Sequence, residues 1–284
     1  MAKIIDGKAV SQKIKDQLRI RTGELKSKGI VPGLAVIIAG EDPASKIYVK
    51  NKKKACEEIG IVSYEYALPV ETTEEELINL IKDLNNDNNV SGILCQLPLP
   101  KHINEEKVIY SIDPAKDVDC FHPVNVGKLM TGNPIMQPCT PYGVMELIRE
   151  TGIEISGREC VIIGRSNIVG KPQALLLLAA NGTVTICHSK TKNLSEVCRR
   201  ADILVVAIGK AKFVDASFVK PGAVVIDVGM NRDENGKLCG DVDFEPVGEI
   251  ASAITPVPGG VGPMTIAMLM KNTVAAAERQ AVGR

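Results

Sequence analysis

A lysine on the apolar side of a predicted helix is the first residue in this sequence that could do chemistry. The stretch "KIYVKNKKKACEEIG" (46–60) contains five lysines. At about 3.6 residues per turn, four of them lie on one side of a helix, and Lys52 lies on the other side among apolar residues. A buried and unpaired ammonium is strongly unfavourable. Lys52 therefore either extends its head group to solvent along its stem, which the helical pattern alone favours, or is kept for chemistry.

A second candidate site is a tight turn between a buried strand and a helix in "VIIGRSNIVGKPQALLLLAANG" (161–182). This is the layout of a dinucleotide-binding βα unit. The usual three glycines are only partly present, because Gly164, Ser166 and Val169 occupy their positions. An ordinary turn of an α/β domain is the alternative interpretation. We expect Gly164, Arg165 and Ser166 to bind the cofactor.

The next predicted strand indicates which dinucleotide binds. NAD-binding folds place an Asp or Glu about twenty residues after the glycines, where it binds the ribose 2′-hydroxyl. Here the strand "TVTIC" (183–187) is followed by His188-Ser189-Lys190-Thr191, which offers no carboxylate. Arg165 and Ser189 are donors suited to a 2′-phosphate, whereas Lys190 could equally be a surface lysine. The sequence therefore predicts NADP as the cofactor.

The elements that position these residues alternate between short apolar runs and helical patterns. Seven runs rich in Val and Ile lie at 33–40, 63–68, 91–97, 159–164, 183–187, 201–209 and 223–229. This alternation predicts an α/β fold of two domains, each a mostly parallel sheet with flanking helices.

A region rich in Pro, Gly and Asn (113–143) separates the third run from the fourth, and we place the domain junction near its end. The first expected domain, residues 1–139, holds the substrate and the catalytic residues, and the C-terminal helix 265–284 completes it. The second, residues 140–264, is a Rossmann-type NADP-binding domain.

Composition limits the partners and the compartment. The chain of 284 residues carries 34 basic and 34 acidic residues, so no overall field attracts nucleic acid or an anionic membrane. The eight cysteines stand singly, without metal-site spacing. No apolar run approaches the roughly 18 residues of a membrane-spanning helix. We expect a reduced, cytoplasmic protein that acts on a small molecule.

Seven motifs point to one family. They are "YVKNKKKA", "QLPLP", "KDVDCFHP", "PCTP", "GRSNIVGKP", "CHSKT" and "TPVPGGVGPMT". Together they make the sequence resemble the bifunctional methylenetetrahydrofolate dehydrogenase/methenyltetrahydrofolate cyclohydrolase family along nearly its whole length. The resemblance implies oxidation of 5,10-methylenetetrahydrofolate with NADP, then hydrolysis of the methenyl product to 10-formyltetrahydrofolate in the same cleft. It also implies a homodimer.

The resemblance further implies which residues act. The catalytic residues would be Lys52, Tyr48, Gln96 and Asp119. Lys52, with a pKa lowered by an apolar pocket, would shuttle the proton in hydrolysis, and Gln96 would accept a hydrogen bond from it. Tyr48 would stack on a ring of the folate, and Asp119 would bind pterin N–H groups. Met230 would lie near the dinucleotide. Further substrate contacts would come from Cys95, Leu97, Pro258, Gly259, Gly260, Val261 and Gly262.

One departure and several alternatives stay open. The family's usual "DVDG" reads "DVDC" here, which leaves the backbone path at Cys120 uncertain. The carboxylates of "DPAKDVD" could suggest a divalent cation, but neither reaction needs one, so we predict no metal. A dehydrogenase without the hydrolase, or a non-catalytic NADP-binding module, are the competing functions.

Overall fold

The computed structural model describes residues 1–282, without the side chains at positions 43 and 44, and it divides into two compact units. The six-stranded unit consists of Met1–Ser11 and Thr140–Thr265, and the three-stranded unit consists of Gln12–Cys139 and Ile266–Arg284. Each unit contains a parallel sheet with flanking helices, which confirms the predicted fold class.

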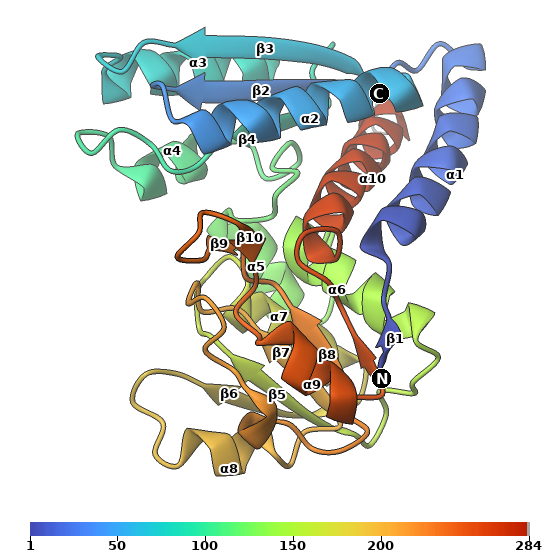
Figure 1. Cartoon of the computed structure of the whole chain (residues 1–284). Coiled ribbons are helices and arrows are strands. Elements are labelled where there is room, and N and C mark those ends of the chain that lie inside the picture. Colours follow the sequence, from blue (N-terminus) through green and yellow to red (C-terminus); the bar gives the residue numbers. More distant parts are fainter. Residues whose placement is uncertain (283–284) are drawn as a thin grey trace. The chain divides into compact units, whose positions relative to one another are not determined.

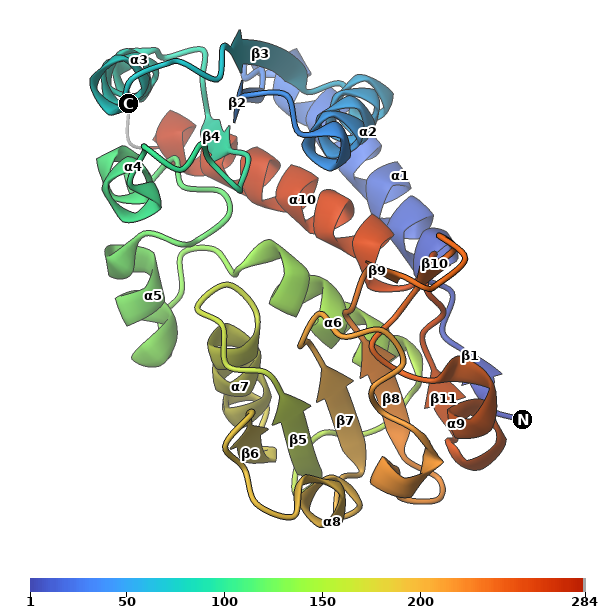
Figure 2. The ribbon, with the colours of Figure 1, turned by 60° about the vertical axis from the view of Figure 1, so that its left-hand side comes forward.

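The sheet of the three-stranded unit has the order β3-β2-β4. Its strands are β2 (Gly33–Ala39), β3 (Val62–Leu68) and β4 (Gly92–Cys95). Every residue of the central strand β2 is buried, because α2 (Pro43–Ile59) and α3 (Glu74–Asn86) lie on opposite faces of the sheet (Figures 1 and 2). Ala35, Ile37 and Ala39 pack against α3, and the alternate side chains of β2 point to the other face.

Helix α2 carries Lys52, and both of its ends are defined by local chemistry. The side chain of Asp42 accepts a hydrogen bond from the Ser45 N–H at 2.7 Å, which caps the N-terminus. Gly60 ends the helix with a φ of 89°, a left-handed conformation that glycine adopts readily. The register of Lys52 along this helix is therefore set at both ends.

The remaining helices of the three-stranded unit bring distant parts of the chain together. They are α4 (Glu105–Ser111), α5 (Pro123–Met130) and the parts of α1 (Gly7–Ser27) and α10 (Val261–Val282) that belong to this unit. Helices α1 and α10 lie side by side (Figures 1 and 2), and Arg21 forms an ion pair with Glu278.

The sheet of the six-stranded unit has the order β1-β11-β8-β7-β5-β6, with parallel pairing throughout. Its strands are β1 (Lys3–Ile4), β5 (Glu159–Ile163), β6 (Thr183–Cys187), β7 (Ile203–Val206), β8 (Val224–Asp227) and β11 (Ala253–Ile254). The other elements are α6 (Cys139–Glu150), α7 (Gly170–Ala179), α8 (Leu194–Cys198), the 3₁₀ helix η1 (Ala216–Phe218), β9 (Asn231–Arg232), β10 (Leu238–Cys239) and α9 (Phe244–Ile250).

Each of the seven predicted apolar runs overlaps a strand, and the structure differs from the prediction in three other places. Residues 1–11, which we expected in the first domain, belong to the six-stranded unit because Lys3 pairs with Ala253 and Ile4 with Ile254. Helix α5 lies inside the stretch that we interpreted as loop-rich. The C-terminal helix extends to Val282, and positions 283–284 of its expected range lie outside the described residues.

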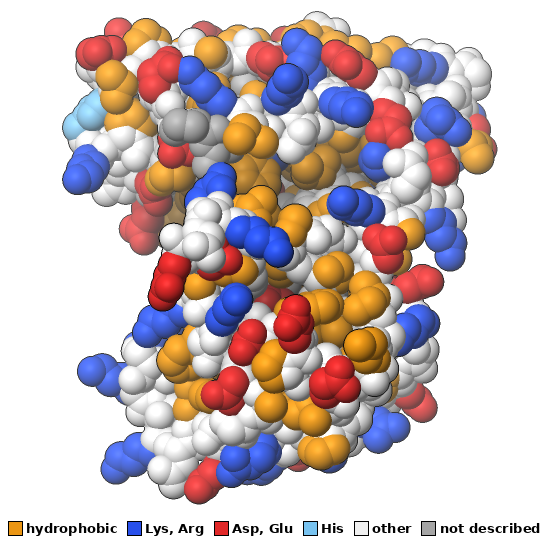
Figure 3. Space-filling view, in the orientation of Figure 1, with side chains coloured by type: hydrophobic (Ala, Val, Ile, Leu, Met, Phe, Trp, Pro, Cys, Tyr) orange, Lys and Arg blue, Asp and Glu red, His pale blue; other side chains and the backbone are white. Residues whose placement is uncertain are grey.

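The surface carries side chains of both charges. In the view of Figure 3, basic and acidic side chains alternate with apolar ones over the visible face of each unit, as the balanced composition suggests. Among residues 1–282, no helix combines the length and the apolar character that crossing a membrane requires.

Candidate active site

Lys52 is buried in the three-stranded unit. Its exposed fraction is 7%, whereas Lys50, Lys53 and Lys54 on the other side of α2 are exposed. The side chain therefore does not reach solvent in the way that a snorkelling lysine does. Burial lowers the pKa of the Lys52 ammonium below its ordinary value, and the negative charge of Asp119 opposes part of that shift.

Gln96, which directly follows strand β4, is the hydrogen-bond partner of Lys52. The Lys52 Nζ donates to Gln96 Oε1 at 2.7 Å, and Gln96 Nε2 donates to the Leu97 carbonyl at 2.7 Å. Because the amide nitrogen is occupied by that carbonyl, the amide oxygen faces the lysine. Lys52 is thus held by a neutral acceptor, which orients the ammonium without fixing its charge.

Asp119 is the carboxylate whose charge affects the pKa of Lys52. It is half-buried, and burial raises the pKa of its carboxyl, while Lys52 and a hydrogen bond from the Cys139 thiol oppose part of the increase. The neighbouring Asp117 is only 2% exposed, and its carboxylate accepts hydrogen bonds from the His122 N–H and the Asn125 side chain. Asp117 therefore stabilises the turn, and Asp119 is the carboxylate that shares its environment with Lys52.

The other predicted residues of this unit lie on α2, on β4 or just after β4. Tyr48 is half-buried one turn before Lys52 on α2, and burial raises the pKa of its hydroxyl. Cys95 ends β4 and is 8% exposed, and burial raises the pKa of its thiol to about 12, so it stays a neutral thiol. Leu97 is half-buried and supplies the carbonyl that orients Gln96.

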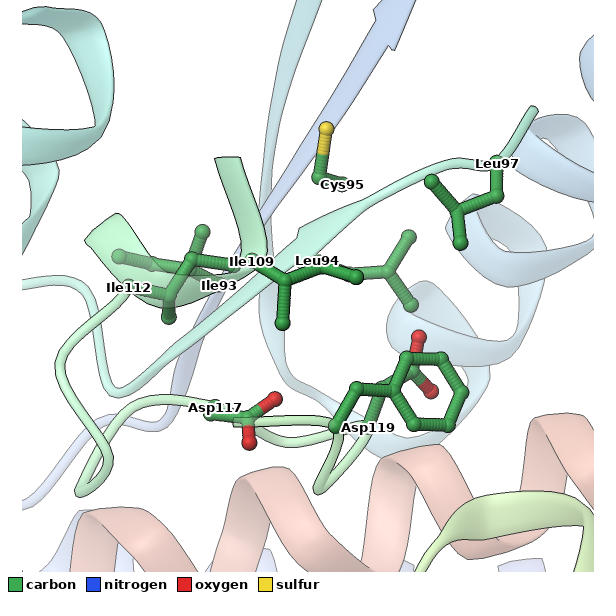
Figure 4. Close-up of a pocket in the computed structure, with 9 residues that line it drawn as sticks. Ile93, Leu94, Cys95, Leu97, Ile109, Ile112, Asp117 and Asp119 are labelled. Carbon is green, nitrogen blue, oxygen red and sulfur yellow. The ribbon is translucent and has the colours of Figure 1, made fainter. Parts of the chain in front are cut away.

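A small cavity lies between β4 and the loop that carries the two aspartates (Figure 4). Its volume of ≈ 10 Å³ is about what one water molecule needs. A folate ring requires far more space than this volume. The residues around it are Ile93, Leu94, Cys95, Leu97, Ile109, Ile112, Asp117, Asp119 and Phe121.

Asn272 of α10 supports the backbone beside Asp119, and the sequence prediction missed it. Its Nδ2 donates to the carbonyls of Val118 and Gln137, each at 2.8 Å, and the Cys139 thiol also donates to the Val118 carbonyl at 3.3 Å. Asn272 is 3% exposed. An asparagine within the apolar pattern "AMLMKNTVAAA" was the available signal, since a buried amide must find partners.

The backbone at Cys120 keeps a conformation typical of glycine. Its φ is 60°, in the left-handed region, and its side chain is 1% exposed. Burial raises the pKa of the Cys120 thiol well above its ordinary value, so the thiol is neutral and a poor nucleophile. Cys120 therefore adopts a left-handed conformation that is unfavourable for a residue other than glycine.

The predicted phosphate turn follows β5 in the six-stranded unit. A Cβ on Gly164, whose φ is 129°, would lie 2.2 Å from the Ala207 carbonyl oxygen, and a Cβ on Gly170 would lie 2.3 Å from the Gly164 oxygen. Both positions therefore require glycine. The hydroxyl oxygen of Ser166 accepts hydrogen bonds from the N–H groups of Val169 (3.1 Å) and Gly170 (3.3 Å). Its hydroxyl proton can still be donated to a ligand.

The end of β6 lies beside this turn. Ile163 pairs with Cys187, and the Gly164 N–H donates to the Cys187 carbonyl at 2.9 Å. Arg165, Ser189 and Lys190 are exposed at these neighbouring strand ends. This compact turn, with exposed donors and no carboxylate after β6, fits a dinucleotide that carries a 2′-phosphate.

The remaining predicted residues also lie in the six-stranded unit. Pro258 and Gly259 precede α10, and Val261 and Gly262 open it. The backbone of Gly260 lies directly against Gly7, since a Cβ on Gly7 would lie 1.9 Å from the Gly260 oxygen. Met230, which follows β8, is 47% exposed. The structure thus gathers Lys52, Gln96 and Asp119 in one unit and the expected NADP-binding residues in the other.

The sequence matches two descriptions of one family. Residues 5–119 match "Tetrahydrofolate dehydrogenase/cyclohydrolase, catalytic domain", and residues 138–281 match "Tetrahydrofolate dehydrogenase/cyclohydrolase, NAD(P)-binding domain". Among curated proteins, the "Bifunctional protein FolD" of Acetivibrio thermocellus is 70% identical over 280 residues, which cover 99% of this chain and 98% of that protein.

Solved structures agree along the full length of the chain. The bifunctional enzyme FolD from Campylobacter jejuni is 53% identical, with a TM-score of 0.96 over 98% of this chain and 99% of that one. The methylenetetrahydrofolate dehydrogenase-cyclohydrolase of Trypanosoma brucei, solved with NADP and an inhibitor, is 41% identical, with a TM-score of 0.95 over 99% of this chain and 98% of that one.

Proposed function

The chain belongs to the tetrahydrofolate dehydrogenase/cyclohydrolase family, and from that premise we propose how its residues divide the two reactions. The protein oxidises 5,10-methylenetetrahydrofolate with NADP and then hydrolyses the 5,10-methenyl product to 10-formyltetrahydrofolate. The residues that handle protons belong to the three-stranded unit, and the residues that bind the dinucleotide belong to the six-stranded unit. The observation that carries this proposal is the buried Lys52, held by Gln96 at 2.7 Å.

In the oxidation, this chain needs to position the folate. When bound, NADP supplies the hydride acceptor. A nitrogen lone pair of the folate assists departure of hydride from the methylene carbon, so this step needs no base from the protein. Asp119 binds the N–H groups of the pterin, and Tyr48 stacks on one of its rings. The contacts of Cys95 and Leu97 with the substrate, and those of residues 258–262, belong to the same proposal.

In the hydrolysis, Lys52 moves the protons. Water that attacks the methenyl carbon loses one proton to Lys52. A ring nitrogen gains a proton when the carbon–nitrogen bond breaks, and the remaining hydroxyl proton leaves to solvent as the formyl carbonyl forms. A lysine whose pKa is lowered by burial can accept the proton from the attacking water and deliver it to the ring nitrogen. Gln96 keeps the ammonium at one place without neutralising it. The hydrolysis therefore depends on Lys52 and the oxidation does not.

For the cofactor, the turn after β5 and the end of β6 provide the binding groups. The 2′-phosphate would be bound by the Arg165 guanidinium and the Ser189 hydroxyl, and the Ser166 hydroxyl and the Gly164 turn would bind the diphosphate. Met230 follows strand β8, which is separated from β5 by β7, and there it can contact the nicotinamide end.

The family of the chain and one exposed strand support a proposal for its cellular compartment and its oligomeric state. We expect it in the cytoplasm as a homodimer. Strand β6 is an edge strand of its sheet, and Ile186 on it is 40% exposed, a surface that favours association. Sedimentation of the purified protein at several concentrations tests the dimer, and a single species with the mass of one chain would contradict it.

The function is tested by mixing the protein, methylenetetrahydrofolate and NADP while absorbance is recorded. We expect NADPH to form, and methenyltetrahydrofolate to appear and then decay faster than it does spontaneously. Decay at the spontaneous rate alone would favour the dehydrogenase without the hydrolase. Failure to form NADPH, with NADP still bound, would favour the non-catalytic NADP-binding module.

A further inference from the structure

Asp241, which plays no part in the reactions above, is a fully buried carboxylate in the six-stranded unit, with 0% exposure. Its Oδ2 accepts hydrogen bonds from the N–H groups of Ile208 (2.7 Å) and Gly209 (3.0 Å). Its Oδ1 accepts from the Lys210 N–H and from the Asn231 side-chain amide, each at 2.8 Å. One side chain therefore ties the segment after β7 to the segment after β8.

Asp227, at the end of β8, holds the backbone of Asp241 in turn. Its Oδ1 accepts from the Asp241 N–H at 3.0 Å and from the Gly229 N–H at 2.9 Å, and its Oδ2 accepts from the Val242 N–H at 2.9 Å. Asp227 is 3% exposed. The two carboxylates thus act in series, since Asp227 fixes the chain at Asp241 and Asp241 fixes the two segments.

Two glycines make this arrangement possible. A Cβ on Gly240 would lie 1.8 Å from Oδ2 of Asp227, and a Cβ on Gly229 would lie 2.3 Å from Cγ of Asp241. Any larger residue would displace a carboxylate. Burying two neighbouring carboxylates is also unfavourable, because burial and the charge of Asp241 raise the pKa of Asp227 to about 7. Asp227 and Asp241 are therefore an energetically unfavourable pair of buried carboxylates, which indicates a role beyond packing.

The position of the pair in the sheet indicates that purpose. In the order β8-β7-β5-β6, the phosphate turn follows β5 and the donors for the 2′-phosphate follow β6. Ligands of open parallel sheets lie outside the carboxyl ends of the strands. The nicotinamide end of the dinucleotide must therefore extend over the ends of β7 and β8, where Asp241 holds Ile208–Lys210 and Asn231.

We propose that Asp241 is a positioning residue for NADP, because it fixes the segments after β7 and β8 in the conformation that receives the nicotinamide end. This inference rests on the proposed function, since it assumes that the six-stranded unit binds NADP. In this proposal Asp241 holds the backbone N–H groups of Ile208–Lys210 and does not itself contact the cofactor.

Asp241→Asn in the full chain tests the proposal, because it keeps the shape of the side chain but replaces one acceptor oxygen with an amide group. Either orientation of the amide sets N–H groups against two of the four donors. The measurements are the Kd for NADP by titration calorimetry, the KM for each substrate, and the rate of methenyltetrahydrofolate hydrolysis without NADP. We expect the Kd and KM for NADP to rise at least about tenfold. Hydrolysis should stay within about twofold of wild type, because Lys52, Gln96 and Asp119 lie in the other unit.

Asp243→Asn is the matched control. Asp243 lies two residues away, and its side chain makes no capping hydrogen bond to α9. The Kd of the Asp243→Asn variant for NADP should therefore equal that of the wild type. If Asp241→Asn does not fold, Asn231→Ala decides instead. It removes one donor to Asp241 from a half-buried side chain, and the Kd for NADP should rise a few-fold.

The results distinguish a failure of the positioning role of Asp241 from a failure of the proposed function. An unchanged Kd for NADP in Asp241→Asn, or in Asn231→Ala if that variant must decide, would overturn the positioning role. Equal loss of NADP binding and of hydrolysis would also overturn it, because a general loss of structure would explain both. A wild-type protein that binds NADP without oxidising methylenetetrahydrofolate would contradict the proposed function alone.

Discussion

The ammonium of Lys52 donates a hydrogen bond to Oε1 of Gln96 at 2.7 Å, and the other end of the same amide is held by the Leu97 carbonyl. The lysine is therefore oriented by a dipole while burial lowers its pKa. A carboxylate in the same place would orient it equally well but would also stabilise the charged form.

Gln96→Glu should impair hydrolysis more than oxidation. The new negative charge raises the pKa of Lys52, so the acid limb of the pH–rate profile for hydrolysis should move to higher pH. We expect a loss of at least about tenfold at neutral pH. Gln96→Met, which removes the acceptor without adding a charge, is the control and should not move the limb upward. A profile for Gln96→Glu that coincides with wild type would contradict this account of Gln96.

Asp119→Asn should move the same limb in the opposite direction. The carboxylate of Asp119 opposes the decrease in the Lys52 pKa, so its removal lowers that pKa further and the limb moves to lower pH. The KM for both folates should rise because the pterin loses an acceptor. Asp113→Asn, at an exposed turn position in the same loop, is the control and should leave the profile in place. If the limb stays in place or moves to higher pH in Asp119→Asn, the charge of Asp119 does not raise the pKa of Lys52.

The sequence predicted the elements with strong local signals. Strand β2 is apolar along its whole length because it is buried on both faces, and α2 shows a clear division between lysines and apolar residues. Strands β1 and β11 have two residues each and pair across some 250 positions of the chain. Pairing over that separation leaves no periodic signal, so the assignment of residues 1–11 depended on tertiary structure.

The candidate site was predictable where residue type itself suggested chemistry. Lys52 was conspicuous because a lysine is costly on an apolar face, and Arg165 because it stands within a glycine turn. Asn272 and Asp241 act through backbone groups that are distant in sequence. Apart from side chains such as that of Asn231, their partners are backbone carbonyls and N–H groups, which leave no motif in the sequence that could identify the contacts.

Arg165→Ala should reduce the preference for NADP over NAD. A hydrogen bond to a charged group contributes about 1.5–3 kcal/mol, so the ratio of kcat/KM values for the two cofactors should fall at least about tenfold. Arg158→Ala, which removes an exposed positive charge just before the opposite end of β5, is the matched control. An unchanged ratio in Arg165→Ala would mean that the 2′-phosphate is bound elsewhere.

Cys120→Gly should retain both activities, because the thiol is buried and neutral. Glycine relieves the left-handed conformation at φ 60° but loses the packing of the side chain. Cys120→Ala also loses most of that packing and keeps the strain, so it should be less stable than the glycine variant by about 1 kcal/mol. Chemical denaturation of both variants measures the difference. A loss of either activity beyond about tenfold in Cys120→Gly would reveal a role for the thiol.

Lys52→Arg should restore little hydrolysis, although it keeps a positive charge. Guanidinium does not release its proton near neutral pH, so it cannot accept the proton of the attacking water. The rate of hydrolysis of added methenyltetrahydrofolate measures the effect. Substantial hydrolysis in this variant would show that a fixed positive charge is sufficient.

The central claim is that Lys52 carries protons in hydrolysis and is not needed as a base in oxidation, and Lys52→Met tests it most directly. Methionine keeps the length of the stem and removes the amine. The measurement is the absorbance of methenyltetrahydrofolate after the variant is mixed with methylenetetrahydrofolate and NADP, corrected for spontaneous hydrolysis. We predict that methenyltetrahydrofolate and NADPH form and that the former accumulates without enzymatic decay. Decay near the wild-type rate would contradict the account, because Lys52 would then be a buried lysine with no part in the chemistry.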